Sequence, residues 1–247
     1  MTGVLDARGP AGMAGRRAVV TGAARGIGAQ IALELARAGA EVTVVDQRDP
    51  GETVRAIKAE GGQAWGERLD VTDRAAVAAA FGSLPALDAL VTSAAVYGDT
   101  VSVDELSESE VDQVLGVNVK GTLWTIQAAL PLLRHGGGQV VCLGSVAGKV
   151  GGVLAGPHYV ASKGAVHALV KWLAKTEASN GIRANGLAPG VVDTEMVAGR
   201  GYDPGYCPLG RLARPEEIAR VAAFLASPAS SYMTGTVVDV NGGYAMG

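Results

Sequence analysis

A tyrosine and a lysine four residues apart, Tyr159 and Lys163, are the side chains whose types and spacing most clearly suggest chemistry. On a helix, residues at i and i+4 lie on one face, with Cβ atoms about 5–6 Å apart. A phenol with a pKa of about 10 is a poor base at neutral pH, but a neighbouring ammonium favours the phenolate and lowers that pKa. The pair therefore predicts a proton-transfer residue. The alternative is a half-buried tyrosine beside a solvated lysine, the usual arrangement when such a pair stands alone.

A glycine-rich turn lies upstream, where Gly22, Gly26 and Gly28 follow a β-branched run and open a segment of helical period. Their spacing is G-x-x-x-G-x-G, and this strand-turn-helix context is the one that a dinucleotide motif requires. Glycines let the backbone approach a pyrophosphate, which sits at the positive end of the following helix. The alternative is a tight turn with close helix packing. Together with the Tyr–Lys pair, the turn predicts hydride transfer.

Asp46 ends the next β-branched run, about 20 residues beyond the turn, where a carboxylate accepts hydrogen bonds from the adenosine ribose. A 2′-phosphate there would meet like charge, so Asp46 favours NAD(H) over NADP(H). The alternatives are a helix-initiating or loop aspartate, and a phosphate site built by Arg25 or Arg48.

Short apolar runs alternate with longer segments of helical period along the whole chain. This alternation predicts an α/β fold, a doubly wound Rossmann-type parallel sheet with helices on both faces. We expect a flexible tail over residues 1–14 and a single domain over 15–247. The predicted strands are Arg17–Thr21, Glu41–Asp46, Ala64–Leu69, Leu87–Thr92, Gln139–Leu143, Arg183–Leu187 and Val237–Val240. The predicted helices are Ile27–Ala38, Gly51–Glu60, Asp73–Phe81, Ser107–Leu133 as two helices with a break near Gly116–Asn118, Tyr159–Ser179 and Pro215–Ala226.

Composition excludes several classes of partner. A formal net charge of -3 over 247 residues gives no electrostatic footprint for nucleic acid or an anionic membrane. No apolar run approaches the ~20 residues of a membrane span, and the N-terminus lacks the apolar stretch of a signal peptide. Cys142 and Cys207 show no metal-ligand spacing and suit a reducing cytoplasm, so we expect a cytoplasmic protein without a metal.

Further motifs, in order along the chain, resemble those of the short-chain dehydrogenase/reductase family in its compact single-domain form. The resemblance spans about Gly15 to Gly243. It rests on the turn Thr21–Gly28, Asp70-Val71, Asn118, Ser145, the Tyr159/Lys163 pair, and Pro189-Gly190 followed by Thr194. One departure is the segment Thr92-Ser93-Ala94-Ala95, where the family usually has Asn-Asn-Ala-Gly. This replaces amides and puts a Cβ at a position where glycine permits close approach.

The resemblance implies a catalytic set and a cofactor site. Tyr159 would be the general acid/base, Lys163 would lower its pKa and hold the nicotinamide ribose, Ser145 would hydrogen-bond the substrate oxygen, and Asn118 would hold a water of a proton relay. The expected cofactor-binding residues are Gly22, Arg25, Gly26, Ile27, Gly28, Asp46, Asp70, Val71, Ser93, Ala94, Tyr159, Lys163, Pro189, Gly190, Val192 and Thr194.

Three functions fit these motifs. The first is an NAD-dependent oxidoreductase acting on a small to medium, largely apolar secondary alcohol or ketone. The second is a 3-oxoacyl-thioester reductase using NADPH, and the third is a catalytically silent NAD-binding regulatory protein. The stretch between Thr194 and Pro215 predicts a mobile lid over the substrate, carrying Tyr202, Tyr206 and Cys207. The candidates for the pocket wall are Val96, Tyr97, Val153, Leu154 and His158.

Two predicted helices, Asn118–Leu133 and Tyr159–Ser179, carry apolar residues on more than one face, which indicates burial on a second side. These residues include Trp124, Ile126, Ala128, Leu169, Val170 and Trp172. In the resembled family these helices form a dimer contact and the C-terminal segment completes a tetramer. We therefore expect a homotetramer or homodimer; the alternative is that these residues pack within one subunit.

Overall fold

The computed structural model describes residues 12–152 and 154–246. Seven parallel strands form one sheet in the order β3-β2-β1-β4-β5-β6-β7. Chain order reverses between β1 and β4, so the sheet is doubly wound, as the alternation of elements predicts. The strands are β1 (Arg17–Thr21), β2 (Glu41–Asp46), β3 (Gln63–Arg68), β4 (Ala89–Thr92), β5 (Gly138–Leu143), β6 (Ile182–Pro189) and β7 (Val237–Val240).

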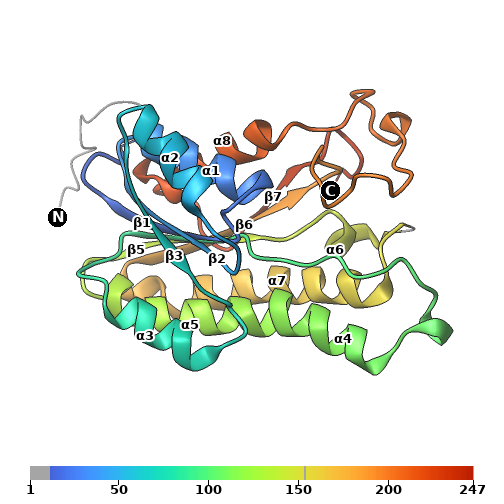
Figure 1. The fold of residues 1–247 in the computed structure, drawn as a ribbon, viewed down its shortest axis with the longest axis horizontal. Helices are drawn as coiled ribbons and strands as arrows, with labels where there is room; N and C mark the ends of the chain where they lie inside the picture. The colour runs from blue at the N-terminus through green and yellow to red at the C-terminus, as the bar shows by residue number, and fades with distance from the viewer. Residues whose placement is uncertain (1–11, 153, 247) are drawn as a thin grey trace.

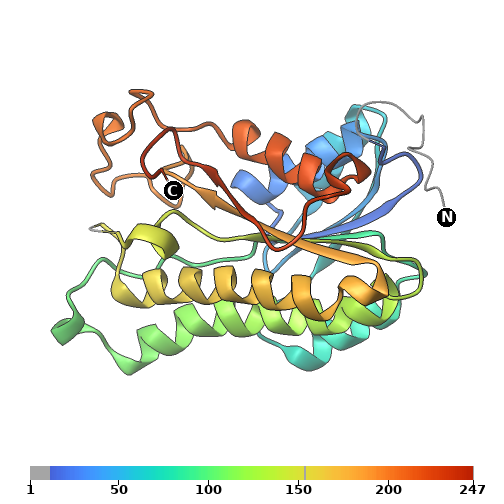
Figure 2. The ribbon, with the colours of Figure 1, turned by 180° about the vertical axis from the view of Figure 1, so that it is seen from behind.

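Helices cover both faces of the sheet, with α1, α2 and α8 on one face and α3, α4, α5 and α7 on the other (Figure 1). Figure 2 shows the same two helical layers from behind, with the sheet between them. The helices are α1 (Gly26–Arg37), α2 (Gly51–Ala59), α3 (Arg74–Gly82), α4 (Glu108–Leu115), α5 (Thr122–Leu133), α6 (Ala147–Val150), α7 (Pro157–Thr176) and α8 (Pro215–Ala226).

Every strand except the edge strand β3 contributes to two hydrophobic cores, because successive side chains of a strand point to opposite faces. In β1, Val20 packs into the core under α1 and α8, whereas Val19 packs into the core under α3, α5 and α7. Both valines are buried. The near-continuous apolar strands therefore match a sheet covered on both faces.

The sequence predicts β1, β2, β7 and α8 with the bounds observed, and most other elements to within one to three residues. The helical run over 108–133 differs from the prediction. Instead of a break near Gly116–Asn118, a π-helical segment, η2 (Gly116–Gly121), connects α4 to α5. A π-turn adds a residue to the helix without interrupting it, and such turns are frequent at functional sites.

Two further segments were not foreseen. The short helix α6 forms in the glycine-rich stretch after β5. Near the N-terminus, Met13 is fully buried in the core under α1, and its carbonyl accepts a hydrogen bond from the Arg16 amide at 3.0 Å. The chain is therefore anchored two residues before the predicted domain start. The rest of the predicted tail, residues 1–11, lies outside the described residues.

Candidate active site

A cleft of about 350 Å³ opens at the carboxyl ends of the strands, where chain order reverses between β1 and β4. Open α/β sheets bind their ligands at this position. Every residue predicted to bind the cofactor lines this cleft: Gly22, Arg25, Gly26, Ile27, Gly28, Asp46, Asp70, Val71, Ser93, Ala94, Tyr159, Lys163, Pro189, Gly190, Val192 and Thr194. Ser145 lines it too, whereas Asn118 is buried behind it.

The glycine turn is packed so closely that two of its glycines leave no room for a side chain. A Cβ on Gly28 would lie 2.1 Å from the Gly22 carbonyl oxygen, and one on Gly22 would lie 2.5 Å from the Cα of Ala94. Gly22 also has a φ of 66°, in the left-handed region, which residues with a Cβ rarely adopt. Gly26 has room for a Cβ, but its φ of 58° also lies in the left-handed region and favours glycine.

The first turn of α1 is free to bind an anion. Its N-cap residue, Arg25, makes no side-chain hydrogen bond to the turn, and the turn carries no acidic residue. The first amide groups of a helix have no partner within it, and they form its positive end. This uncapped turn lines the cleft, so the site fits the diphosphate of a dinucleotide. The guanidinium of Arg25 pairs with Glu195, on the segment after β6.

Asp46 ends β2 with its carboxylate held at the cleft. One carboxylate oxygen accepts a hydrogen bond from the Ala24 amide at 3.0 Å, and the other accepts one from the Arg48 amide at 2.9 Å. These contacts fix the orientation of the carboxylate, and each oxygen keeps a lone pair for a further donor.

The unusual segment Thr92–Ala95 is held by Thr21. The Thr21 hydroxyl oxygen accepts from the amides of Ser93 at 3.3 Å and Ala94 at 3.4 Å. No non-glycine residue within 12–152 and 154–246 has a positive φ, so Ala95 needs no glycine-like conformation here. The alanine substitution is compatible with the backbone, and the loop takes its hydrogen bonds from β1.

Asn118 lies in the π-helical segment and ties two elements together. Its side-chain oxygen accepts from the Val96 amide at 2.8 Å, while its nitrogen donates to the Val96 carbonyl at 2.9 Å and to the Ser162 hydroxyl at 3.0 Å. Both amide hydrogens are therefore used. The side chain holds the loop after β4 against α7, so a water would have to be held by an oxygen of Asn118.

Tyr159 and Lys163 are both buried on α7, but their electrostatics differ from the prediction. Burial raises the pKa of Tyr159 to about 12, and the neighbouring Ser145 opposes the shift only in part. The Lys163 ammonium lies 5.6 Å from the centre of the tyrosine ring and donates to the Leu143 carbonyl at 2.9 Å, and burial outweighs its effect on this pKa. Burial also lowers the pKa of Lys163 to about 8. Tyr159 is therefore a phenol at neutral pH, suited to donating a proton.

Ser145 follows β5 and precedes α6, where its hydroxyl oxygen accepts from the Ala147 amide at 3.1 Å. That contact occupies a lone pair and leaves the hydroxyl hydrogen available to a substrate oxygen. Tyr159 and Ser145 thus place two O–H groups at one point of the cleft, an arrangement that can polarise and protonate a carbonyl.

The substrate end of the cleft is bounded by Tyr97, whose ring centre lies 4.5 Å from that of Tyr159. The Tyr97 hydroxyl donates to the Leu154 carbonyl and contacts the hydroxyl of Tyr202. Tyr202 belongs to the lid segment, which we define as residues 195–214. Arg200, from the same segment, lies over the outer face of Tyr97, 4.4 Å from the ring centre.

Not all of the other residues predicted to form the pocket wall line the cleft. Val96, Leu154, Tyr202 and Tyr206 line the cleft, and Cys207 is buried. The prediction for His158 as a wall residue is wrong, because its side chain is fully buried and lies against Gly98 and Gly156, away from the cleft. Val153 lies outside the described residues.

Sequence reasoning missed several residues of the cleft, including Gln47, Glu195 and Tyr244. Gln47 adjoins Asp46 and could have been found from that position. Glu195 and Tyr244 carry no local signal, since only the return of the chain to the cleft brings them there. Over the described parts of the chain, His, Cys, Asp and Glu side chains form no group of three that could hold a metal, and no helix is both long and apolar enough to span a membrane.

Comparison with known proteins agrees with this geometry. The family model described as enoyl-(acyl carrier protein) reductase matches residues 22–245. Cis-4-hydroxycyclohexanecarboxylate dehydrogenase of Sinomonas cyclohexanicum is 40% identical over 243 residues, covering 93% of this chain and 96% of the relative.

Two solved structures are also similar over nearly their whole length. One, assigned as a 2-deoxy-D-gluconate 3-dehydrogenase from Agrobacterium tumefaciens with bound NADP, has a TM-score of 0.89 and 36% identity, covering 95% of this chain and 98% of the other. The second, a 3-oxoacyl-[acyl-carrier protein] reductase from Brucella melitensis with bound NAD, has a TM-score of 0.88 and 34% identity, covering 94% and 92%.

Proposed function

Because the chain belongs to the short-chain dehydrogenase/reductase family, whose members are NAD(P)-dependent oxidoreductases of CH–OH groups and ketones, we propose that it prefers NAD(H). We also propose that it uses Tyr159 as general acid/base. The observation that carries the proposal is that one cleft is lined both by the uncapped first turn of α1 and by the side chains of Tyr159 and Ser145. The proposed substrate is a small to medium, largely apolar secondary alcohol or ketone.

A nicotinamide cofactor held in this cleft would supply or accept the hydride. During ketone reduction, the Ser145 hydroxyl donates a hydrogen bond to the carbonyl oxygen, where negative charge develops. Tyr159 then transfers its phenolic proton to that oxygen, and in alcohol oxidation the same residue takes the proton back. Lys163 sits one helical turn away and is proposed to stabilise the phenolate and to contact the nicotinamide ribose. Asn118 holds the relay water through an oxygen atom.

The preference for NAD(H) rests on Asp46 and on the pairing of Arg25. The Asp46 carboxylate is oriented by two backbone amides at the end of β2, and a 2′-phosphate beside it would meet like charge. Arg25 is paired with Glu195, which leaves it less available for a phosphate. Asp46→Ala should therefore lower the ratio of kcat/KM with NAD(H) to kcat/KM with NADP(H). A wild-type enzyme that favours NADP(H) would contradict the proposed preference.

The proposal of a largely apolar substrate rests on the side chains of the cleft. Five of the six tyrosines of the chain line it, and no phenylalanine or tryptophan does. Tyrosine offers a rigid apolar ring with a polar tip. These rings therefore favour a largely apolar substrate that carries a polar reacting group.

A second candidate is the reduction of a 3-oxoacyl thioester, favoured by the similarity to the reductase with bound NAD. The same Tyr159 and Ser145 hydroxyls would act on the 3-oxo group. In this reaction the remainder of a long thioester would have to leave the cleft beside the lid segment.

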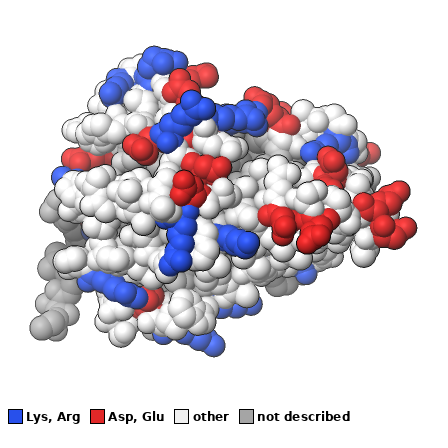
Figure 3. Space-filling model, turned by 60° about the horizontal axis from the view of Figure 1, so that its bottom comes forward, with Lys and Arg blue, Asp and Glu red and all other residues white. Residues whose placement is uncertain are grey.

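We also propose that the protein works in the cytoplasm as a homotetramer or at least a homodimer. Two of the residues that suggested association, Ile126 and Val170, are core residues of one subunit. Another of them, Trp172 on α7, is 57% exposed, and Leu123 on α5, which was not among them, is 37% exposed. Figure 3 shows broad areas without charged side chains on the helical face of the molecule that comes forward in that view. Light scattering at micromolar concentration should report the oligomer, and an active monomer would contradict it.

The test of the proposed function is a panel of cyclic and linear secondary alcohols, ketones and a 3-oxoacyl-coenzyme A thioester, assayed by nicotinamide absorbance with NAD(H) and NADP(H) in parallel. Tyr159→Phe should retain NAD binding and lose about 10²–10⁴-fold in turnover, because only the proton-transfer group is removed. Turnover near that of the wild type in this variant would refute the role of Tyr159. No turnover of any compound with NAD bound would favour a regulatory protein.

A further inference from the structure

One face of α7 carries three polar side chains in register: Tyr159, Lys163 and, one further turn along, His167. Residues spaced by four lie above one another on a helix. The proposed mechanism assigns roles to Tyr159 and Lys163 but none to His167. All three are buried, and burying a polar group without a partner is unfavourable, so the contacts of His167 call for an explanation.

The end of β5 supplies those contacts, one residue after another. Lys163 donates to the Leu143 carbonyl at 2.9 Å. Two residues later, the Ser145 amide donates to Nε2 of His167 at 3.4 Å, a long hydrogen bond. Between them, the imidazole lies so close to Gly144 that a Cβ on this residue would be 2.2 Å from Nε2. The ring therefore presses against the backbone from which Ser145 projects.

We propose that His167 is a positioning residue that holds the Ser145 backbone so that the serine hydroxyl faces the reacting oxygen. This inference rests on the proposed function, because it acts through Ser145. His167 itself lies outside the cleft and touches neither substrate nor cofactor in this account. The long hydrogen bond and the packing on Gly144 act together. The hydrogen bond orients the Ser145 amide, and the packing fixes how closely this backbone lies against the imidazole.

The charge state of His167 suits this task. Accepting from an amide requires an unprotonated Nε2. Burial lowers the pKa of His167 to about 4, and the nearby Lys149, Lys163 and Lys171 lower it further, whereas Asp239 opposes them. The imidazole is therefore neutral near pH 7 and can accept. Protonation would add a hydrogen to Nε2 and break the contact with Ser145.

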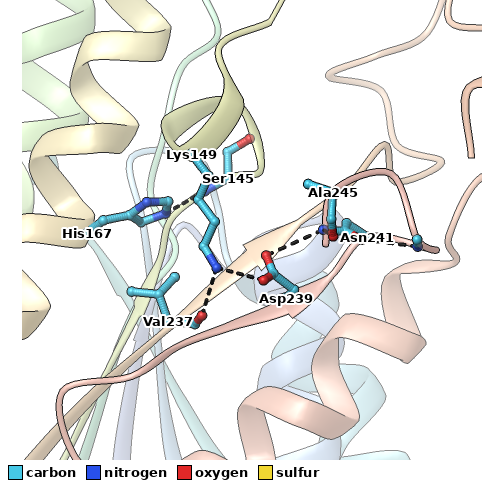
Figure 4. A network of polar contacts seen from close by, with 8 residues as sticks. Ser145, Lys149, His167, Val237, Asp239, Asn241 and Ala245 are labelled. Carbon is cyan, nitrogen blue, oxygen red and sulfur yellow. Dashed lines mark hydrogen bonds and ion pairs between the residues drawn. The ribbon is translucent and has the colours of Figure 1, made fainter. Parts of the chain in front are cut away.

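A second anchor holds the segment beyond Ser145. Lys149, on α6, donates to the Val237 carbonyl at 3.1 Å and to the Asp239 carboxylate at 2.7 Å (Figure 4). Figure 4 shows His167 on one side of Ser145 and this lysine contact on the other. The serine is thus fixed between α7 and β7, with His167 as its nearer support.

The experiment compares His167→Leu, which removes the acceptor but keeps much of the volume, with His167→Gln, whose side-chain oxygen can still accept. The substrate is the panel compound with the highest rate. We expect His167→Leu to lower kcat at least tenfold while the Kd for NAD stays within twofold, and His167→Gln to recover part of the loss. His135→Gln, at an exposed histidine whose ring contacts only the Pro131 carbonyl, serves as the control with wild-type kcat.

A double mutant distinguishes positioning from general damage to the fold. In a Ser145→Ala background the His167→Leu substitution should have no further effect on kcat, because the group being positioned is gone. Equal losses in both backgrounds would overturn the inference, as would wild-type kcat in His167→Leu. If His167→Leu does not fold, the comparison rests on His167→Gln and on its crystal structure, in which an unmoved Ser145 with lowered kcat would also overturn it. If Ser145→Ala itself keeps full turnover, the proposed function fails instead.

Discussion

Asn118→Ala tests whether this buried amide holds the active-site loop in place. The substitution removes three hydrogen bonds, two with the Val96 backbone and one with the Ser162 hydroxyl. Each is worth about 1 kcal/mol net, so we expect a loss of about 3 kcal/mol in the free energy of unfolding. For a domain of this size, 1 kcal/mol shifts Tm by about 2–4 °C, which predicts a fall of about 6–12 °C.

The assay is thermal unfolding followed by circular dichroism, with Thr122→Val as the matched control. Thr122 is buried one turn further along and makes one hydrogen bond, from its hydroxyl to the Asn118 carbonyl at 2.8 Å. Its loss should therefore lower Tm by only about 2–4 °C. If Asn118→Ala lowers Tm no more than Thr122→Val does, Asn118 does not tie the loop after β4 to α7, and the reasoning is wrong.

Three further expectations concern the cofactor, the substrate and pH. Gly28→Ala should weaken NAD binding at least about tenfold (1.4 kcal/mol), because the new Cβ would lie 2.1 Å from a carbonyl oxygen. Fluorescence titration measures this affinity. The control is Gly82→Ala, whose Cβ would meet nothing within 4 Å and which should bind NAD as the wild type does. Tyr97→Phe should raise KM about five- to tenfold with an unchanged Kd for NAD, because about 1–1.5 kcal/mol of hydroxyl contacts to the lid segment and Leu154 is lost; an unchanged KM would contradict this. Since burial raises the pKa of Tyr159 to about 12, the phenolate needed for alcohol oxidation becomes more abundant as pH rises. Initial rates of alcohol oxidation should therefore increase from pH 6 to 8, whereas initial rates of ketone reduction should not. A flat oxidation profile would refute this.

The sequence predicts most of the fold because the fold depends on local signals. The β-branched run of β2 and the Pro-initiated helix α8 have the bounds expected from their composition. The glycine turn is equally local, and the close approach of Gly28 to Gly22 explains its spacing. Short elements in glycine-rich stretches are harder to predict, as α6 shows, because tertiary contacts such as that of Lys149 with Asp239 hold them.

The parts of the site that the sequence could not predict depend on long-range contacts and burial. The contact between Tyr97 and Tyr202 joins residues far apart in the chain, and no spacing rule relates them. The prediction for the Tyr159–Lys163 pair leaves out desolvation, because spacing on a helix says nothing of burial. Here burial raises the pKa of the tyrosine, and Lys163 turns its ammonium to a strand carbonyl.

The register of α7 against the end of β5 has a consequence for how this protein can vary. Because Tyr159, Lys163 and His167 share one helical face, adding or deleting a residue within α7 would rotate part of that face by about 100° and separate the three groups. Changes in the stretch 151–156, between α6 and α7, leave that face intact, since Lys163 still fixes the helix to Leu143. Insertions and deletions that change substrate specificity should therefore be tolerated in the stretch between α6 and α7, and should disrupt the site when they fall within α7.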